Sequence, residues 1–439
     1  MKEAIQFQFT SRQKLVLSGF MGLGLLCMII IFFTDDALAP RFWSNFLLNT
    51  VFFTGIAFIA VFAISAMITA YSGWHTVFKR VWEAYAQFLV VGLILMVIII
   101  IGMYGGFHHL YHWADAASVE ADEILQGKSG FLNRGFYTIA TLVTIGVWYY
   151  FARKMRQLSI EEDRSATGDY SAYKTIKKYA AGFLPIAAVT SAVIIWLWVM
   201  SVDAHWYSTL FAWYATASWF VSMIALTILT LLYLRSIGYF PDVSVEHFHD
   251  LGKFLFGFSI FWTYLWFSQY MLIWYGNVGE ETIYFHNQRN NYPVLFYGNL
   301  VINFVVPFFI LLRNDTKRKK GTLIVASVLV FLGHWMDFFL MIKPGVLHTY
   351  HELGGHGEGG HSLLGAGSEQ TARLVSDAAH GAETASSFVS GFTIPGLLDI
   401  GVFLGFLAFF LYFVFMQLAK ARLQPVGDPF IGESFHHHV

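Results

Sequence analysis

The 439-residue chain has very little cysteine and very little charge. Cys27 is its single cysteine, so the chain cannot form an internal disulfide, an iron–sulfur site or a covalent c-type haem attachment. Charged residues make up 13% of the sequence, about half the share found in soluble domains. If the protein takes part in electron transfer, its metal centres therefore belong to other chains.

Proline and deeply placed histidine are scarce as well. Pro185 and Pro307 stand alone within apolar runs, which argues against the broken helices that surround the midplane site of a transporter. A di-haem cytochrome b needs histidine pairs on two membrane spans, whereas His334 is the only histidine well inside a predicted span. These absences disfavour a stand-alone transporter and a haem b protein.

Long hydrophobic runs are what the sequence does contain. Hydrophobic residues make up 56% of it, and the runs reach the roughly 20 residues needed to cross a membrane core of about 30 Å. The first run is too long for a signal peptide, and no small-residue cleavage site follows it. We expect an all-α integral membrane protein with ten transmembrane helices, at Val16–Phe33, Phe46–Thr69, Ala84–Tyr104, Phe131–Phe151, Ala180–Met200, Tyr207–Leu234, Phe254–Trp274, Val294–Leu312, Leu323–Met341 and Ile394–Leu418.

Lysine and arginine are distributed unevenly between the two sides of such a protein. With ten spans, 21 of the 27 Lys and Arg residues fall on the side that holds both termini. The other side has six: Arg41, Lys128, Arg134, Arg289, Lys343 and Arg373. The positive-inside rule then predicts that both termini are cytoplasmic.

A weak internal repeat appears at an offset of four spans. The third and seventh spans both end in aromatic-polar turns, GGFHHLYHW and MLIWYGNVGEE. The repeat predicts two four-helix bundles, residues 46–200 (spans two to five) and 207–341 (spans six to nine), with spans one and ten outside them. In such a protein, sites lie where helices of one bundle face each other.

The predicted outer loop at residues 343–390 is rich in histidine and glycine. His348, His351, His356 and His361 have a spacing that suits a metal ion, whereas the glycine content favours a solvated segment. Its second half, from Glu369 to Ala385, is predicted to be an interfacial helix or a contact surface for an outer partner.

The stretch from Gly257 to Tyr284 combines an apolar helix with hydroxyl and aromatic stripes. Tyr264, Ser268, Met271 and Tyr275 recur on one helical face, and Gln269 adjoins it. The aromatic residues alone are typical of an interfacial belt, while the polar residues favour a buried polar cavity. The following turn carries Glu280 and Glu281, for which solvent exposure is the simpler interpretation.

Ionisable side chains within membrane spans are costly and are therefore candidates for function. Most of them gather toward the predicted outer side, whereas Glu83 lies at the inner start of span three. The outer candidates for a quinol pocket or a proton path are His334, Asp337, Asp399, Asp203, His205, His108, His109 and His112. A quinol pocket needs a histidine or carboxylate to accept protons, and aromatic walls for the ring. The alternative is that these groups only satisfy polar neighbours between helices.

Three segments carry a resemblance to a known family. The HHLYHW turn, the FSQYMLIWYGNVGEETIYF segment and HWMDFFLMIKPG at the end of span nine resemble the smaller of two homologous membrane subunits of bacterial alternative complex III. Both subunits belong to the polysulfide-reductase-type, NrfD-like superfamily. The resemblance covers nearly the whole chain and implies two four-helix bundles, each flanked by an outer helix.

The resemblance also implies a function and partners. It implies a bacterial inner-membrane subunit of a quinol:cytochrome c or quinol:oxidase complex that contributes to quinol binding (menaquinone or ubiquinone), to proton translocation, or to both. Partners would be the larger homologue, a multihaem cytochrome c, an iron–sulfur protein, a monohaem cytochrome c, a terminal oxidase and lipid, with no nucleic acid. Haem and iron–sulfur clusters would reside in those partners, and this chain would bind no cofactor covalently. The alternative is a structural anchor without its own quinol site.

Overall fold

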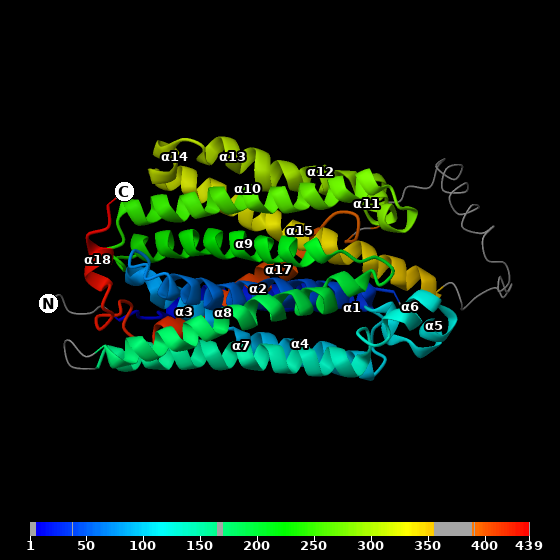
Figure 1. Ribbon diagram of the computed structural model, residues 1–439, viewed down its shortest axis with the longest axis horizontal. Coiled ribbons are helices and arrows are strands. Elements are labelled where there is room, and N and C mark those ends of the chain that lie inside the picture. Colours follow the sequence, from blue (N-terminus) through cyan, green and yellow to red (C-terminus); the bar gives the residue numbers. More distant parts are fainter. Residues whose placement is uncertain (1–5, 37, 165–169, 355–388, 390, 439) are drawn as a thin grey trace.

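The described part of the computed structural model is built of helices and covers residues 6–36, 38–164, 170–354, 389 and 391–438. The long helices run side by side along one axis (Figure 1). The N-terminal and C-terminal segments meet at one end of the bundle, which we call the terminal end. The opposite, distal end carries three short helices: α5 (Ala116–Ala121), α6 (Glu123–Lys128) and α11 (Gly279–Asn291).

Nine helices in the described ranges are long and apolar enough to cross a membrane, which confirms the prediction of an all-α, multi-pass membrane protein. They span Ser11–Thr34, Pro40–Thr69, Thr76–Tyr104, Arg134–Glu162, Ser171–Val202, Thr209–Ser236, Pro293–Leu311, Lys320–Tyr350 and Leu397–Leu418. Each overlaps one predicted span. The remaining predicted span lies in α10 (Val245–Gly276), which has 32 residues but is less apolar because of its Trp, Tyr, Ser and Gln side chains.

Most of these helices are continuous. They are α1 (Ser11–Thr34), α2 (Pro40–Thr69), α7 (Arg134–Glu162), α8 (Ser171–Trp198), α9 (Thr209–Ser236), α15 (Lys320–Gly354) and α17 (Leu397–Leu418). The third membrane segment is divided into η1 (Thr76–Phe78), α3 (Lys79–Ala86) and α4 (Leu89–Tyr104). The eighth comprises α12 (Pro293–Leu300), the π-helical turn η4 (Val301–Val305) and α13 (Val306–Leu311), followed by the short α14 (Asn314–Arg318).

Local sequence explains where several helices begin. Thr10 and Gln13 form a reciprocal capping box at the start of α1. Pro40 occupies the first turn of α2, where its missing N–H group costs nothing. The side chain of Asn133 accepts a hydrogen bond from the Phe136 N–H at the start of α7, with an N–O distance of 2.7 Å.

The core lies between α2 and α9, in which 23 of 30 and 20 of 28 residues are buried. Gly55 makes this packing possible, because a Cβ atom there would lie 1.9 Å from the Trp219 ring of α9. Trp219 also stacks on Phe338 of α15, with 5.6 Å between the ring centroids. The two central helices are therefore fixed against each other and against α15.

The packing follows two groups of helices. The first group is α2, α3–α4, α7 and α8, and the second is α9, α10, α12–α13 and α15. α1 packs mainly on α17, and α17 in turn contacts α2 and α3. The α1–α17 contact is close because Gly24 faces Gly405: a Cβ atom on Gly24 would lie 2.5 Å from the Gly405 Cα.

α15 extends well past the predicted end of span nine. It continues through Lys343 to Gly354, so the segment predicted as an outer loop from residue 343 starts as helix. The predicted helix from Glu369 to Ala385, together with His356 and His361, lies outside the described residues.

Candidate functional site

Polar side chains from all four segments of the second helix group meet around a carboxylate on α15. We call this set the Asp337 cluster. It consists of Tyr214 and Ser218 on α9, Trp262 on α10, Asn299 on α12, Asn303 on η4, and His334 and Asp337 on α15. Asp337 and His334 are completely buried. The predicted candidates His334 and Asp337 are thus brought together in the interior of a helix bundle.

Asp337 is held by neutral hydrogen-bond donors. Its Oδ1 accepts hydrogen bonds from the Tyr214 hydroxyl and from Asn299 Nδ2, the latter at 2.6 Å. Its Oδ2 accepts one from the Trp262 indole N–H at 3.0 Å. Within the described ranges, no Lys or Arg forms an ion pair with it. Asp337 is therefore held by hydrogen bonds from uncharged groups and not by an ion pair.

His334 lies one helical turn before Asp337. Its Nδ1 is 3.9 Å from Asp337 Oδ2, which is too long for a hydrogen bond, and 2.8 Å from the Ser218 hydroxyl oxygen. Its Nε2 has no hydrogen-bond partner among the described residues. The ring edge meets Trp262 in a T-shaped contact with centroids 5.2 Å apart. One ring nitrogen of the imidazole is therefore not engaged by any described residue.

An irregular helix turn brings the amide groups into the cluster. Asn303 lies on the π-helical turn and donates a hydrogen bond to Asn299 Oδ1 at 2.5 Å. A Cβ atom on Gly333 of α15 would lie 2.2 Å from Asn303 Oδ1, so glycine is needed for this approach. π-helical turns often mark functional sites. The sequence reasoning missed both asparagines, although a polar pair four residues apart in an apolar run is a detectable signal.

A small cavity adjoins the cluster toward the distal end. Its volume is about 10 Å³, room for about one water molecule. Tyr214, Gln269, Tyr284 and Gln288 supply its polar lining. Tyr214 thus contacts both the cavity and Asp337, and buried Gln269 has no partner for its Nε2 in the part of the chain that is described. Gln269, one of the residues that favoured a buried polar cavity, lines this cavity, whereas Ser268 does not.

Tyr284 closes the cavity from α11. Its ring stacks on Trp206 with 3.9 Å between centroids. Burial raises the pKa of the Tyr284 phenol well above its usual value, and the nearby negative charge of Asp203 adds to this. Asp203, a half-buried candidate, therefore lies near the distal side of the cavity, and Tyr284 stays protonated there.

Asp399 has a different environment, because it is paired with cations. Arg41 Nη2 lies 2.6 Å from its Oδ2, and Lys343 Nζ lies 3.8 Å from its Oδ1. Asn45 donates a further hydrogen bond at 2.6 Å. Gly396 N–H completes the set at 2.8 Å, as the N-terminal cap of α17. Asp399 thus joins α2, α15 and α17 and is permanently neutralised.

The histidines of the HHLYHW turn differ from one another. His108 is buried against Trp43; its Nε2 donates to the Ile99 carbonyl at 2.9 Å, and burial lowers its pKa to about 4. His109 is half-exposed. The ring of His112 lies near that of His205, with centroids 5.6 Å apart. The turn is therefore tied into the structure mainly through His108.

His205 forms an ion pair at the distal surface. Its Nε2 lies 2.5 Å from Asp122 Oδ2. Partial burial by itself raises the pKa of the Asp122 carboxyl, but the hydrogen bond from His205 and two backbone N–H groups bring it below the usual value. Lys128 donates to the carbonyl oxygens of Ala204 and His205 at 2.6 and 3.2 Å. These contacts hold α6 on the loop after α8.

The hydroxyl stripe of α10 faces outward. The Tyr264 and Tyr275 side chains are 63% and 84% exposed, Met271 is also exposed, and Ser268 is half-buried. Glu280 is exposed and Glu281 half-buried at the start of α11. Among the candidates predicted between Gly257 and Tyr284, only Gln269 is buried beside the Asp337 cluster.

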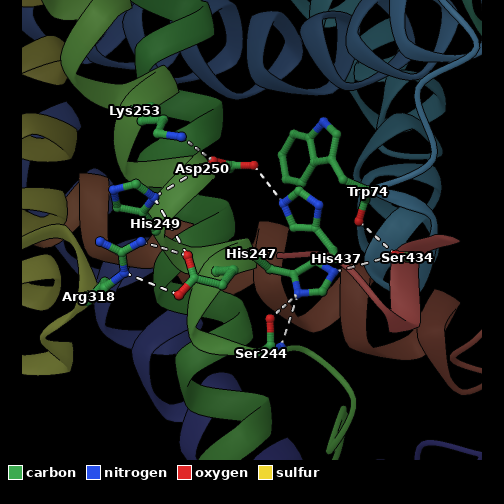
Figure 2. Close-up of polar contacts among 10 residues, drawn as sticks. Trp74, Ser244, His247, His249, Asp250, Lys253, Arg318, Ser434 and His437 are labelled. Carbon is green, nitrogen blue, oxygen red and sulfur yellow. Dashed lines mark hydrogen bonds and ion pairs between the residues drawn. The ribbon is translucent and has the colours of Figure 1, made fainter. Parts of the chain in front are cut away.

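Charged residues also meet at the terminal end, where Glu83 is buried in α3. Arg80 Nη1 lies 2.6 Å from Glu83 Oε2, and Arg156 donates to the Glu83 carbonyl oxygen at 3.2 Å. Figure 2 shows a second group at this end: His247 lies between Ser244 and Ser434, and Asp250 between Lys253 and His437. Within the described ranges, no three His, Cys, Asp or Glu side chains are grouped so that they could hold a metal ion.

Compared with known proteins, the chain matches no protein-family model and no curated protein.

Proposed function

We propose that this chain is a proton-conducting membrane subunit of a quinol:electron-acceptor oxidoreductase complex. The observation that carries the proposal is Asp337, a fully buried carboxyl group among neutral donors at the centre of four helix segments. Carboxylate and histidine groups in the interior of membrane bundles are characteristic of proton relays. In this proposal ten spans cross the bacterial inner membrane, α10 being the seventh, and both termini are cytoplasmic.

Asp337 and His334 divide the task between them. Asp337 binds a proton while Tyr214, Trp262 and Asn299 keep its oxygens in place. His334 exchanges a proton at Nε2, because Ser218 occupies its Nδ1. A water molecule in the adjoining cavity would connect Tyr214 with Gln269 and the distal end, where Asp203, His205 and the HHLYHW histidines lie.

The space beside the Asp337 cluster favours proton movement over quinol oxidation at that cluster. Pockets that enclose cofactor-sized ligands have volumes of about 300–1,000 Å³, whereas the cavity beside the Asp337 cluster has about 10 Å³. A groove of about 710 Å³ between α1, α2 and α17 is large enough, but its lining is apolar and offers no proton acceptor. As the family resemblance implies, the quinone (menaquinone or ubiquinone) would bind mainly in the larger homologous subunit, with haem and iron–sulfur partners accepting the electrons.

The test is a neutral replacement of Asp337 in membrane vesicles that carry the native assembly. Asp337→Asn is expected to preserve quinol turnover while reducing the number of protons released per quinol. Asp315→Asn is the control, because the Asp315 side chain is 71% exposed beside Arg313. His334→Gln, which replaces the titratable imidazole by an uncharged side-chain amide, is a second test. Full proton release in both variants would refute the proposal.

The second candidate is a structural anchor for haem and iron–sulfur partners. It is favoured by the distal part of α10, where Trp274 and Tyr275 expose 67% and 84% of their side chains. It is also favoured by Asp399 and His205, which are engaged in ion pairs. If quinol oxidation and proton release were normal with Asp337 and His334 both neutralised, the anchor function would replace the proton path.

A further inference from the structure

Glu162, the last residue of α7, is a buried carboxyl group without a hydrogen-bond donor. Its side chain lies at the terminal end and the residue is 1% exposed. Neither Oε1 nor Oε2 has a partner among the described residues. Leaving an ionised carboxylate buried and without hydrogen-bond donors is strongly unfavourable. Each unsatisfied buried group of this kind needs an explanation.

The charged groups around Glu162 are already balanced. Lys79 pairs with Asp428 at 2.5 Å. Arg80 pairs with Glu83 and with Asp163, each at 2.6 Å.

The remaining cation of this group is Arg156, which donates to the carbonyl oxygens of Glu83 and Gln417. Three cations thus face three carboxylates before Glu162 is considered. Lys79, Asp428, Asp163 and Arg80 are also the charges that act most strongly on Glu162, and Tyr173 of α8 faces it as well. An ionised Glu162 would add a fourth carboxylate, and no cation among the described residues forms a hydrogen bond with it.

We propose that Glu162 binds a proton and forms, with its surroundings, a proton-binding site at the terminal end of the first helix group. Protonation of Glu162 removes the negative charge of this fourth carboxylate. It also converts one carboxylate oxygen, which can only accept a hydrogen bond, into a hydroxyl group that can donate one. A metal ion is not the alternative here, because the described residues contain no group of three suitable ligands.

A small cavity one helical turn from Glu162 supplies a place for water. Its volume is about 10 Å³, and Lys79, Glu83, Arg156 and Ser159 line its polar part. Ser159 Oγ and Arg80 Nε lack partners in the described ranges. Residues three apart share a helix face, so Ser159 and Glu162 point to the same side of α7. One water molecule in the cavity would satisfy Ser159 and connect it with the charged group.

The site is at the opposite end of the bundle from the Asp337 cavity. Its role in proton movement rests on the proposed function, in which Glu162 would exchange protons with the solvent at the terminal end. The protonation itself does not depend on that function. The two statements therefore need separate measurements.

Infrared spectroscopy of the intact assembly in membranes tests the protonation. The wild-type minus Glu162→Gln difference spectrum at neutral pH is expected to contain the C=O band of a carboxylic acid, shifted in D₂O. Glu161→Gln and Glu83→Gln are the controls and should lack that band in their difference spectra, because Glu83 is paired with Arg80. Glu162→Gln should also keep the wild-type melting temperature, since an amide replaces a neutral acid of the same shape.

Two outcomes would overturn the inference. One is a Glu162→Gln difference spectrum that loses carboxylate bands and no acid band. The other is a clear loss of stability in Glu162→Gln, which would mean that the charge was needed. The proposed function is tested independently, because Asp337→Asn should reduce proton release and leave the Glu162 band in place.

Discussion

His334 and Asp337 lie one turn apart on α15 with 3.9 Å between Nδ1 and Oδ2, yet Ser218 rather than Asp337 forms the hydrogen bond to that nitrogen. The two protonatable groups are thus neighbours that are held separately. The opposite face of α15 behaves differently: Trp335 donates to Asn49 of α2 at 3.1 Å, and Lys343 faces Asp399 of α17. α15 therefore carries the candidate site on one face and structural contacts on the other.

The Tyr214 hydroxyl should contribute measurably to the stability of the Asp337 cluster. Tyr214→Phe removes one donor from a buried carboxylate, so the free energy of unfolding is expected to fall by about 1–3 kcal/mol. Thermal unfolding in nanodiscs measures the effect. Tyr264→Phe is the matched control, because the Tyr264 side chain is 63% exposed, and it should change stability by less than about 0.5 kcal/mol. Equal effects in the two variants would show that the Tyr214 contact to Asp337 is energetically unimportant.

The two sides of the Asp399 ion pair should respond unequally to mutation. Asp399→Asn leaves Arg41 and Lys343 close together without a carboxylate, so a loss of roughly 3–5 kcal/mol is expected. Lys343→Met leaves Asp399 with Arg41 and Asn45, and the loss should be smaller.

A double-mutant cycle measures this coupling. Asp399→Asn combined with Lys343→Met should be less destabilised than the sum of the single variants, because the buried lysine is gone as well. Strict additivity would contradict a direct Lys343–Asp399 interaction.

The all-α, multi-pass architecture could be predicted because long apolar runs are a property of the local sequence. The proximity of Asp337 and His334 could also be predicted, since residues three apart share a helix face. The partners Tyr214, Trp262 and Asn299 lie on other helices, 38 to 123 residues away from Asp337 in the chain. The sequence alone does not show which helices are neighbours or which face each helix turns toward the bundle interior. It therefore does not show that these donors meet at Asp337.

The sequence also does not show that Asp399 forms ion pairs whereas Asp337 is held by neutral donors, because this difference again depends on distant residues. Both are single acids in apolar runs, and the sequence places both among the candidates. Arg41, a distant residue at the start of α2, decides the difference by pairing with Asp399. Lys343 was expected in a loop, but α15 extends far enough to bury it beside the same carboxylate.

Acidification should destabilise the protein through His108. Burial lowers its pKa from 6.5 to about 4, so between these values the unfolded chain binds more protons than the folded one, and stability falls as the pH drops from 6.5 toward 4. At roughly 1.4 kcal/mol per pKa unit, the contribution of His108 is about 3 kcal/mol. Below pH 4 it should change no further.

Unfolding measured at several pH values between 7.5 and 4 tests this contribution. His108→Gln keeps a side-chain N–H for the Ile99 carbonyl but cannot titrate, so its stability should vary less with pH than that of the wild type. The half-exposed neighbour His109 provides the control, and His109→Gln should retain most of the wild-type pH dependence, because burial is the main cause of the lowered His108 pKa. An unchanged profile in His108→Gln would exclude His108 as the source.

The close contact of α1 with α17 should depend on Gly24. A Cβ atom there would lie 2.5 Å from the Gly405 Cα. Neither position can be changed by rotating a side chain, so the contact can be relieved only by moving a helix. Gly24→Ala is therefore expected to push the helices apart and to cost roughly 1–3 kcal/mol. Gly19→Ala on the same helix is the control: its Cβ meets nothing within 4 Å, and exchanging glycine for alanine in a helix should stabilise slightly. Cysteine cross-linking between α1 and α17 measures the separation of the two helices.

The prediction fails if Gly24→Ala gives the same cross-linking yield and the same melting temperature as Gly19→Ala. In that case the glycine contact does not hold the two helices together, and α1 is attached to the bundle by its remaining side-chain packing.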